Sequence, residues 1–584
     1  MEIIERFSTW LNDIVWGGIP IGGEEIPIIA IALLGTGIFL TLRLAFVQLR
    51  HFGHGVAVTT GKYDDPDEPG DVSHFQALTT ALSATVGIGN IAGVAIAIHW
   101  GGPGALFWMW VTAFLGMATK FTEVTLAQHY RQVDFPDRDP SRWEGSVSGG
   151  PMYYIERGLG PNWKWMAVLF ATLLGITAFF TGNAIQANTV SDIVSTEFGV
   201  AAWVTGLITS AVVAAVILGG ITRIGRVTSI LAPLMAAIYV LGALYVIIVN
   251  IEQLIPSIGL IFTEAFNPTA GIAGTGVGAF LTTLMYGVRR GLFSNEAGQG
   301  SAPIAHAAAK TDEPVSEGVV ALLEPFIDTI VICTMTAMVI IMTGVWDDRV
   351  PTEIGLGSGD ISYYAEMEDG RFRSVSAPDE IVVRQGTPEV LNEGPQLSWH
   401  EVPVADFYVD AERTQPFSGV IRPEQGVAVA DDGTSYPILY GEAVETGAPL
   451  TALGFQRGLP GQWGNYVVLL SVLLFAVSTA ISWSYYGDRC ANYLLGPKAV
   501  LPYKIVFVIM HFVGAVLPLT VIWDMGDIFL GIVIFPNLIA LLMLSPVVAG
   551  LMKSYFERRP WLENAEVHKR VVAEKRARKG HRPE

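Results

Sequence analysis

A short glycine-rich run interrupts an apolar stretch in the first quarter of this 584-residue chain. It reads from Ala84 through Gly87, Ile88 and Gly89 to Asn90. Glycine costs about 1 kcal/mol relative to Ala inside a helix, and an Asn amide is unfavourable at membrane depth. Unwound backbone is tolerated in a bilayer only where it lines a cavity or lies inside protein. The run therefore predicts a helix that is broken near Ile88.

A second interruption lies at Arg290–Ser301, where Ser294, Asn295 and Glu296 follow each other among glycines. Close packing of helices through small residues would explain the glycines. It does not explain a carboxylate beside two polar side chains, so the pattern favours a second broken helix near Ser294. Two interrupted helices at corresponding positions of two repeats indicate a substrate site near the bilayer midplane.

A broken helix exposes free N–H groups on one half and free C=O groups on the other. The N–H end attracts a carboxylate through hydrogen bonds and the helix dipole, whereas carbonyl and hydroxyl oxygens suit a hard cation. A zwitterionic amino acid with Na⁺ matches both ends. We expect the amides of Ile88 and Gly89 to hold the carboxylate. We expect Thr85, Val86 and Asn90 to offer oxygens to sodium.

Other apolar stretches carry polar residues that can complete such a site. Ser478 and Thr479 are adjacent hydroxyls, and Trp483 lies one turn after Thr479 on the same helix face. We expect the hydroxyls to bind sodium and Trp483 to wall the substrate pocket, unless the hydroxyls bond back to their own helix. Gln186 is expected to bond the substrate or to join helices. Asp328 lies near a cation site, pairs with a nearby Arg, or is protonated.

The composition places these residues in an all-α polytopic membrane protein. Hydrophobic residues make up 51% of the chain and charged residues 15%, with a mean hydropathy of +0.45. Soluble domains carry about 25% charged residues. Eleven apolar segments are long enough to span a bilayer, namely 26–47, 75–100, 104–129, 164–188, 200–219, 227–250, 272–300, 318–344, 463–489, 501–522 and 528–552. Spans 2–6 and 7–11 each cross five times, which predicts a 5+5 inverted repeat after one extra helix.

Lys and Arg set the expected orientation. They gather in the connections 130–163 and 220–226 and in the tail 553–584, whereas the connection 251–271 has none. The pattern predicts a plasma-membrane protein with its C-terminus in the cytoplasm and its N-terminus outside. The expected parts are an interfacial segment over 1–25, transmembrane helices 1–8 over 26–344, an acidic insert over 345–462, helices 9–11 over 463–552 and a basic cytoplasmic tail over 553–584.

The insert 345–462 holds 20 Asp and Glu, 7 Arg and no Lys, and the alternation of spans places it outside the cell. Ile381–Arg384 and Tyr436–Tyr440 have the pattern of short strands between Pro and Gly turns. We expect a small β-rich extracellular domain. The whole chain has a net charge of −19, and this acid excess with few Lys suits a halophilic host, where salt screens self-repulsion.

The same sequence argues against several protein classes. Cys333 and Cys490 both lie in apolar stretches, so neither disulfides nor a cysteine metal site is expected. The polar segments contain no HExxH or GxSxG motif, which argues against an enzyme. We expect no cofactor other than Na⁺ as coupling ion, no nucleic acid and no protein partner. The expected partners are an amino acid, sodium and the lipid bilayer.

Seven motifs resemble those of the alanine or glycine:cation symporters, also called the sodium:alanine symporter family. They are Gly87–Ala95, Gly101–Ala105, Phe107–Trp110, Lys120–Glu123, Gly149–Tyr154, Arg290–Ser301 and Phe326–Thr329. The resemblance covers nearly the whole membrane part but not the insert 345–462. It implies sodium-coupled symport of small neutral amino acids, chiefly alanine and glycine. It also implies the leucine-transporter-type fold with one additional helix at the start.

The resemblance also implies site residues. They are Asn90, Gln186, Phe293, Thr479 and Trp483 for the substrate, Thr85, Asn90 and Ser294 for one sodium ion, and Ser83, Val86, Ser478 and Thr479 for another. Ile88 stands where many relatives carry Thr, which leaves its backbone amide but removes a hydroxyl. Two alternatives stay open. One is a proton-coupled transporter that uses Asp328 or Glu296, and the other is a membrane amino-acid sensor.

Overall fold

The structure is a computed structural model, and it describes most of the chain. The described residues are 18–21, 24–65, 67–134, 146–268, 277–357, 361–366, 372–374, 376–389, 396–399, 402–517 and 519–580. The helices of the first half are α2 (Ile28–Arg43), α3 (Val47–Arg50), α4 (Phe52–Thr59), α5 (His74–Thr85), η1 (Gly89–Gly93), α6 (Val94–Gly101), α7 (Ala105–His129), α8 (Pro151–Leu159), η2 (Pro161–Trp163), α9 (Lys164–Phe179), η3 (Phe180–Ala184), α10 (Ile185–Phe198), α11 (Ala202–Ile217), α12 (Gly220–Val249), η4 (Ile251–Gln253) and α13 (Leu254–Phe266).

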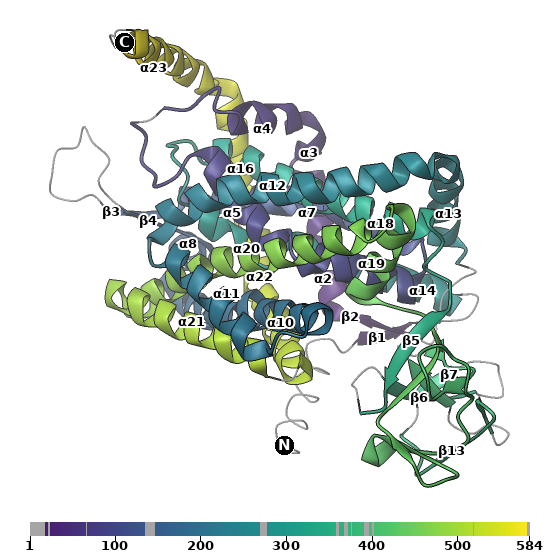
Figure 1. The fold of residues 1–584 in the computed structure, drawn as a ribbon. Helices are drawn as coiled ribbons and strands as arrows, with labels where there is room; N and C mark the ends of the chain where they lie inside the picture. Colours follow the sequence, from purple (N-terminus) through teal and green to yellow (C-terminus); the bar gives the residue numbers. More distant parts are fainter. Residues whose placement is uncertain are drawn as a thin grey trace.

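The second half continues with helices on both sides of a strand-rich segment. These helices are α14 (Val277–Asn295), α15 (Ala302–His306), α16 (Pro314–Ala321), α17 (Leu323–Pro325), η5 (Phe326–Cys333), α18 (Thr334–Met342), η6 (Pro423–Gln425), α19 (Gly447–Gly458), α20 (Trp463–Leu495), η7 (Pro497–Ala499), α21 (Val500–Val516), α22 (Leu519–Arg558) and α23 (Trp561–Gly580). Figure 1 shows the long helices as one bundle, with α23 projecting from one end of it.

Several helices are long enough and apolar enough to cross a membrane. Among the described residues, six helices are long and apolar enough, and the bent pair formed by α5 and η1–α6 adds a seventh span. Each of the eleven predicted spans contains helix, but α2 and α11 are apolar helices of only 16 residues. The structure is therefore that of a multi-pass membrane protein. It also contains helices such as α8, α13 and α19 in stretches predicted as connections.

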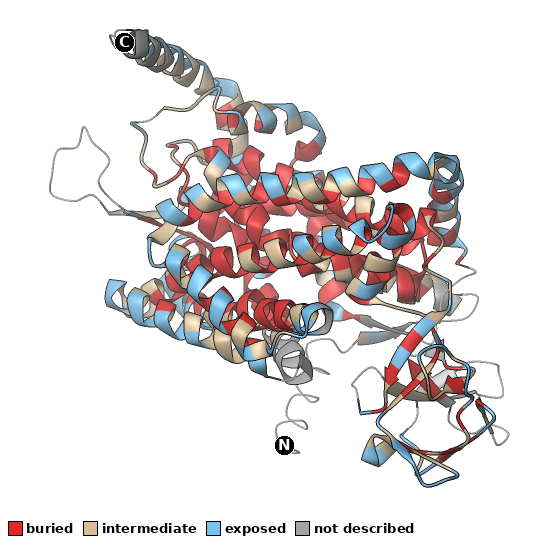
Figure 2. Cartoon of the chain, viewed as in Figure 1, coloured by how far each residue is buried: buried red, intermediate tan, exposed pale blue. Residues whose placement is uncertain are grey.

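The outer faces of the bundle suit a bilayer. Figure 2 shows buried residues gathered in its interior, with exposed residues along the outward faces of α12 and α21. Many exposed side chains there are large and apolar, such as Ile230 and Leu241 on α12 and Leu501 and Ile505 on α21. Contiguous apolar surface on this scale needs a non-aqueous neighbour. Lipid supplies it for a chain with this many apolar helices.

The strands lie mainly in the predicted insert. They are β1 (Gly18–Ile21), β2 (Glu24–Pro27), β3 (Gln132–Asp134), β4 (Ser146–Ser148), β5 (Val350–Gly355), β6 (Ile361–Glu366), β7 (Phe372–Ser374), β8 (Ile381–Arg384), β9 (Thr387–Pro388), β10 (Gln396–Trp399), β11 (Val402–Pro403), β12 (Phe407–Tyr408), β13 (Gly419–Arg422), β14 (Val427–Ala430), β15 (Ser435–Tyr436) and β16 (Ile438–Ala443). β8 coincides with one predicted strand, and Pro437 divides the other between β15 and β16.

Strands β5–β16 form three antiparallel sheets with a core of their own. The sheet orders are β15-β14-β13-β8-β9, β11-β10-β6-β7 and β12-β16-β5. Phe407, Phe417 and Leu439 are fully buried inside this segment. In Figure 1 it forms a lobe at the end of the bundle opposite α23. Of the predicted interfacial segment 1–25, residues 1–17 and 22–23 lie outside the described residues, and β1 pairs with β2 in antiparallel orientation.

Candidate functional site

The first predicted break lies between α5 and η1. The N-terminus of α5 is capped by Ser73, whose hydroxyl accepts a hydrogen bond from the Gln76 amide at 3.3 Å. The helix ends at Thr85, and the chain bends by 56° before it continues into η1 and α6. The Gly87 amide donates to the Asn90 side-chain oxygen at 2.8 Å. Asn90 therefore closes the turn that the glycines allow.

The second predicted break follows α14, which ends at Asn295. Glu296 has φ +55°, and Gly298 and Gly300 also have positive φ. These backbone conformations cannot continue a helix. The Asn295 side-chain oxygen accepts a hydrogen bond from the Ala297 backbone amide at 3.0 Å, which forms an Asx turn directly after the helix. The chain resumes as the short helix α15.

The two breaks share one cavity. Its wall is formed by Ala84, Thr85, Gly87, Ile88, Gly89, Thr181, Gln186, Phe293, Glu296, Gln299, Thr479, Trp483 and Leu530, and the space among these residues is about 360 Å³. About 30 Å³ of it is open to a water-sized sphere, which is room for about two water molecules. Six of the seven residues predicted to bind substrate line this cavity. The seventh, Asn90, lies directly behind it and is fully buried.

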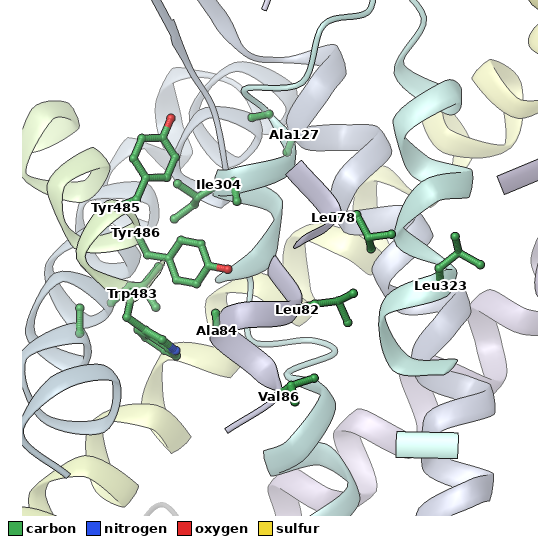
Figure 3. Close-up of a cluster of buried hydrophobic side chains, with 14 of the residues drawn as sticks. Leu78, Leu82, Ala84, Val86, Ala127, Ile304, Leu323, Trp483, Tyr485 and Tyr486 are labelled. Atoms are coloured by element: carbon green, nitrogen blue, oxygen red, sulfur yellow. The ribbon is translucent and has the colours of Figure 1, made fainter. Parts of the chain in front are cut away.

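Aromatic rings form two walls of the cavity. Trp483 is 2% exposed, and its ring occupies the space that a Cβ on Gly182 would need, at 2.3 Å. Phe293 likewise lies 3.2 Å from the position of a Cβ on Gly89. Figure 3 shows Trp483 and Tyr486 on the side of α20 toward Ala84. Because Gly182 and Gly89 have no side chain, the rings of Trp483 and Phe293 can lie against the backbone. The two rings thereby reduce the space that is left for a ligand.

Asn90, Ser294, Asp328 and Thr329 form a buried polar cluster, here called the Asp328 cluster, next to the break that follows α5. Asn90 donates to Asp328 Oδ1 at 2.7 Å and to Ser294 Oγ at 3.0 Å. The hydroxyls of Ser294 and Thr329 donate to Asp328 Oδ2 at 2.6 and 2.8 Å. Asp328 lies in η5, whose π-helical turn is of a type that is frequent at functional sites. The cluster joins the two breaks through a carboxylate and neutral donors.

A second group of oxygens lies where α20 meets α5. Ser478 Oγ and Thr479 Oγ1 lie 3.3 and 3.1 Å from the Ser83 carbonyl oxygen. Ser478 also donates to the Phe475 carbonyl of its own helix at 2.9 Å. The side chains of Ser83, Ser478 and Thr479 are buried, as is Val86 at the end of α5. The structure therefore brings the predicted members of the second sodium site into one region.

Thr85 and Gln186, which are predicted site residues, donate hydrogen bonds to backbone carbonyls of their own helical segments. Thr85 lines the cavity, but its hydroxyl donates back to the carbonyls of Ala81 and Leu82 at 3.3 and 3.4 Å. Gln186 donates to the Thr181 carbonyl at 3.1 Å, while its side-chain oxygen is buried without a hydrogen-bond partner. That oxygen is an acceptor suited to an ammonium group. Neither arrangement follows from the sequence spacing.

The sequence did not single out every residue of the wall. Thr181, Gln299 and Leu530 line the cavity, and the side-chain oxygen of Gln299 is buried without a hydrogen-bond partner. Gln299 lies in the second glycine-rich run, which pointed to the region but not to this residue. Glu296 also lines the cavity and accepts a hydrogen bond from Ser301. Leu530 belongs to α22, and nothing in its local sequence marks it.

Comparison with known proteins identifies the family. The profile of the sodium:alanine symporter family matches residues 1–362 and 434–569. The chain belongs to this family. The sodium/alanine symporter AgcS of Methanococcus maripaludis is 38% identical over 561 residues, which cover 96% of this chain and 98% of that protein. This confirms the resemblance read from the motifs. Sodium:alanine symporters are transporters, so the chain is not an enzyme.

Other relatives extend over equally long parts of the chain. The probable sodium/glutamine symporter GlnT of Bacillus subtilis is 31% identical over 559 residues, 96% of this chain and 92% of that protein. The putative sodium/proton-dependent alanine carrier protein YrbD of Bacillus subtilis is 31% identical over 554 residues, 94% of this chain and 92% of that protein. The family profile omits residues 363–433, which belong to the β-rich segment.

Proposed function

We propose that this sodium:alanine symporter carries a small neutral amino acid, alanine or glycine, into the cell together with Na⁺. One observation supports this most directly: residues from two broken helices and from α10 and α20 line a single small cavity. The two breaks supply backbone polar groups, and the aromatic walls leave little room for a large side chain. The family membership supports an amino acid and sodium as the transported species.

In this proposal the amides of Ile88 and Gly89 hold the substrate carboxylate at the start of the second half-helix. The positive end of a helix dipole and its free N–H groups favour an anion there. The side-chain oxygens of Gln186 and Gln299, buried without hydrogen-bond partners, accept from the substrate ammonium group. Trp483 excludes bulky side chains.

We place sodium at two positions. The first is the Asp328 cluster, where Asn90, Ser294 and the Asp328 carboxylate offer oxygens, with Thr85 nearby in the cavity wall. The second lies among the Ser83 and Val86 carbonyls and the Ser478 and Thr479 hydroxyls. Hard cations prefer such oxygen ligands. A carboxylate at the first position compensates the charge of the ion.

The eleven predicted spans, arranged as one helix followed by a 5+5 inverted repeat, are part of the same proposal. The interrupted α5–α6 and α14–α15 would open the two repeats. The basic connections and tail put the C-terminus in the cytoplasm, and the N-terminus and the β-rich insert outside. The β-rich lobe and α23 at opposite ends of the bundle are consistent with this orientation.

Transport then follows alternating access, in which one helix bundle rocks about the shared site. Each net positive charge that moves inward along a 100 mV potential contributes about 2.3 kcal/mol. That energy corresponds to about fiftyfold accumulation of the amino acid per sodium ion.

Proton coupling is a second candidate. Asp328 and Glu296 are buried carboxylates beside the cavity, and one relative is named a putative sodium/proton-dependent alanine carrier. In this version a proton replaces sodium at Asp328. Uptake would then follow the pH gradient and persist without sodium.

Reconstitution in liposomes tests both versions. Labelled alanine is added with an inward sodium gradient, with an inward proton gradient in a sodium-free buffer, or with neither. We expect labelled alanine to accumulate with the sodium gradient, and not with the proton gradient or without a gradient. Accumulation that needs only the proton gradient would favour the second candidate. Saturable alanine binding without accumulation under any gradient would contradict transport and support the sensor.

A further inference from the structure

A second set of buried charged side chains lies beside the N-terminal end of α5, away from the cavity. It consists of His74 on α5, Lys120 on α7, His306 on α15, Glu317 on α16 and Glu324 on α17. These five residues are called the buried charge network. Their side chains are at most 3% exposed, so water screens their charges weakly.

The five side chains contact one another in one continuous row. The ring nitrogens Nδ1 of His74 and His306 each donate to a different oxygen of Glu317, the second at 2.5 Å. His306 Nε2 faces Glu324 Oε2 at 3.6 Å. Lys120 donates to the other Glu324 oxygen at 3.0 Å. The row therefore joins five helices through two carboxylates.

The row contains two carboxylates and one lysine, so its net charge is zero only if one of the two histidines is protonated and positively charged. Lys120 compensates one of the two carboxylates. A protonated His306 compensates the other, because its Nε2–H then points at Glu324. Neither His306 Nε2 nor Glu324 Oε2 has another hydrogen-bond partner. Without that proton, a nitrogen lone pair faces a carboxylate and one buried negative charge is left uncompensated, which is costly.

The network holds the N-terminal end of α5, which is the end away from the cavity. The amides of Asp71 and Val72, just before α5, donate to the Ala308 carbonyl, and the Lys310 amide donates to the Val72 carbonyl at 2.8 Å. His74 adds its side-chain contact to Glu317. The other end of α5 reaches the cavity at Ala84 and Thr85. A displacement of α5 from these partners would therefore also displace this part of the cavity wall.

We propose that the buried charge network is a proton-binding site whose proton holds α5 in place, so that its release opens the cavity toward the end of the bundle that carries α23. The site is distinct from the proposed sodium positions. The direction relative to the cell rests on the proposed orientation, which makes this the cytoplasmic side. Acid on that side keeps the cavity closed, and alkali opens it.

The charged groups around the network favour retention of the proton. The acidic groups that act on it are Asp64, Glu68, Glu123, Glu296 and Asp328. The basic groups nearby are Arg131, which acts on Glu317, and Lys310 and His568, which act on Asp64. Negative groups therefore outnumber positive ones. Glu68 needs its own control, because burial raises its pKa to about 7.

Pulsed EPR distance measurement tests the proposal without transport. Spin labels are attached to the double variant Phe75→Cys and Lys553→Cys, on α5 and α22. Phe75 is 42% exposed and the Lys553 side chain 75% exposed, whereas Cys333 and Cys490 are buried. We expect one distance population at about pH 6 and a second, displaced population at about pH 9, with the ratio rising about tenfold or more.

His306→Gln in the labelled protein is expected to remove most of this pH response, because Gln cannot bind the proton. His74→Gln provides a second variant if His306→Gln does not fold. The matched controls are His129→Gln, which changes an exposed histidine, and Glu68→Gln. Both are expected to keep the response.

A distance distribution that is the same at both pH values would overturn the proposal. So would a full response in both histidine variants, or a response abolished by Glu68→Gln. The outcome is separate from the transport proposal. A pH-dependent displacement without sodium-driven uptake would contradict symport and leave the proton site intact, and the reverse result would remove the proton site alone.

Discussion

Two buried polar groups in this transporter contain carboxylates, but they differ in what balances the charge. In the buried charge network, Glu317 and Glu324 each contact a basic side chain. In the Asp328 cluster, the hydrogen bonds to the carboxylate come from an amide and two hydroxyls. No ion pair of Asp328 with a Lys, Arg or His occurs in the part of the chain that the structure describes.

The difference indicates different tasks. A buried carboxylate with a resident cation joins helices, and removal of either partner leaves an uncompensated charge. A buried carboxylate with neutral donors retains an electrostatic preference for a mobile cation. The Asp328 cluster lies beside the cavity and is suited to Na⁺ or H⁺. The buried charge network joins five helices at the end of α5 away from the cavity.

The largest expected effect is a loss of stability when Lys120, the positively charged partner of Glu324, is replaced. Lys120→Met leaves Glu324 buried without its closest positive charge. We expect a loss of about 3–5 kcal/mol in stability, as for other broken buried pairs. Thermal unfolding of the purified transporter in detergent measures it. The double variant Lys120→Met with Glu324→Gln should recover most of the loss. Equal instability of the single and double variants would contradict charge balance as the reason.

A smaller effect, on the sodium dependence of uptake, is expected when the Asp328 cluster is changed. Asp328→Asn keeps an oxygen that can accept hydrogen bonds but removes the negative charge. A hydrogen bond or ligand contact to a charged group is worth about 1.5–3 kcal/mol. The sodium concentration for half-maximal alanine uptake should therefore rise about 10- to 100-fold, with little change in unfolding temperature. Unchanged sodium dependence would place the cation elsewhere.

The cavity walls come next in expected size. Trp483→Ala enlarges the space beside Gly182, so the uptake ratio of leucine to alanine should rise about tenfold or more, in line with the 1–3 kcal/mol that a methylene is worth in a pocket. Trp463→Ala is the matched control, since this tryptophan lies on the same helix and is 65% exposed. An unchanged ratio in Trp483→Ala would contradict its place in the substrate wall.

Local sequence predicted the interruptions well. Glycines next to Asn90, and a charged residue next to Ser294, have no role in a continuous apolar helix, so the breaks could be placed within a few residues. Six cavity residues followed from the same reasoning and from the family resemblance. The pairing of Asp328 with Asn90 could not be predicted from spacing, because 238 positions separate the two residues. Only packing of η5 against η1 decides it.

Other features depended on tertiary contacts as well. The Thr85 hydroxyl was expected to face sodium but bonds back into α5. This local alternative is always available to a Thr inside a helix. Gln299 lay within a motif, yet its direction into the cavity depends on the positive φ of Gly298 and Gly300. The strands of the insert were predictable at β8, where Pro and Gly turns bound a short apolar run.

Exposed acidic residues of the insert provide the last contrast. Its ion pairs, such as Arg384 with Glu389 and Arg422 with Glu380, are largely exposed. Salt screens such charges, whereas both buried groups are screened far less. If the acid excess is an adaptation to salt, dilution from about 1 M to about 0.1 M KCl should destabilise the chain, by about 1 kcal/mol or less.

Removal of the insert shows where that salt dependence arises. β5 and β16 pair from Val350–Ala443 to Gly355–Ile438, so a short Gly-Ser turn can replace residues 358–436. We expect this variant to lose the salt dependence of its unfolding temperature and to keep alanine uptake within about twofold, because surface insertions tolerate change. A salt dependence that survives the replacement would assign it to the membrane part, and full-length protein that is indifferent to dilution would end the salt-adaptation hypothesis.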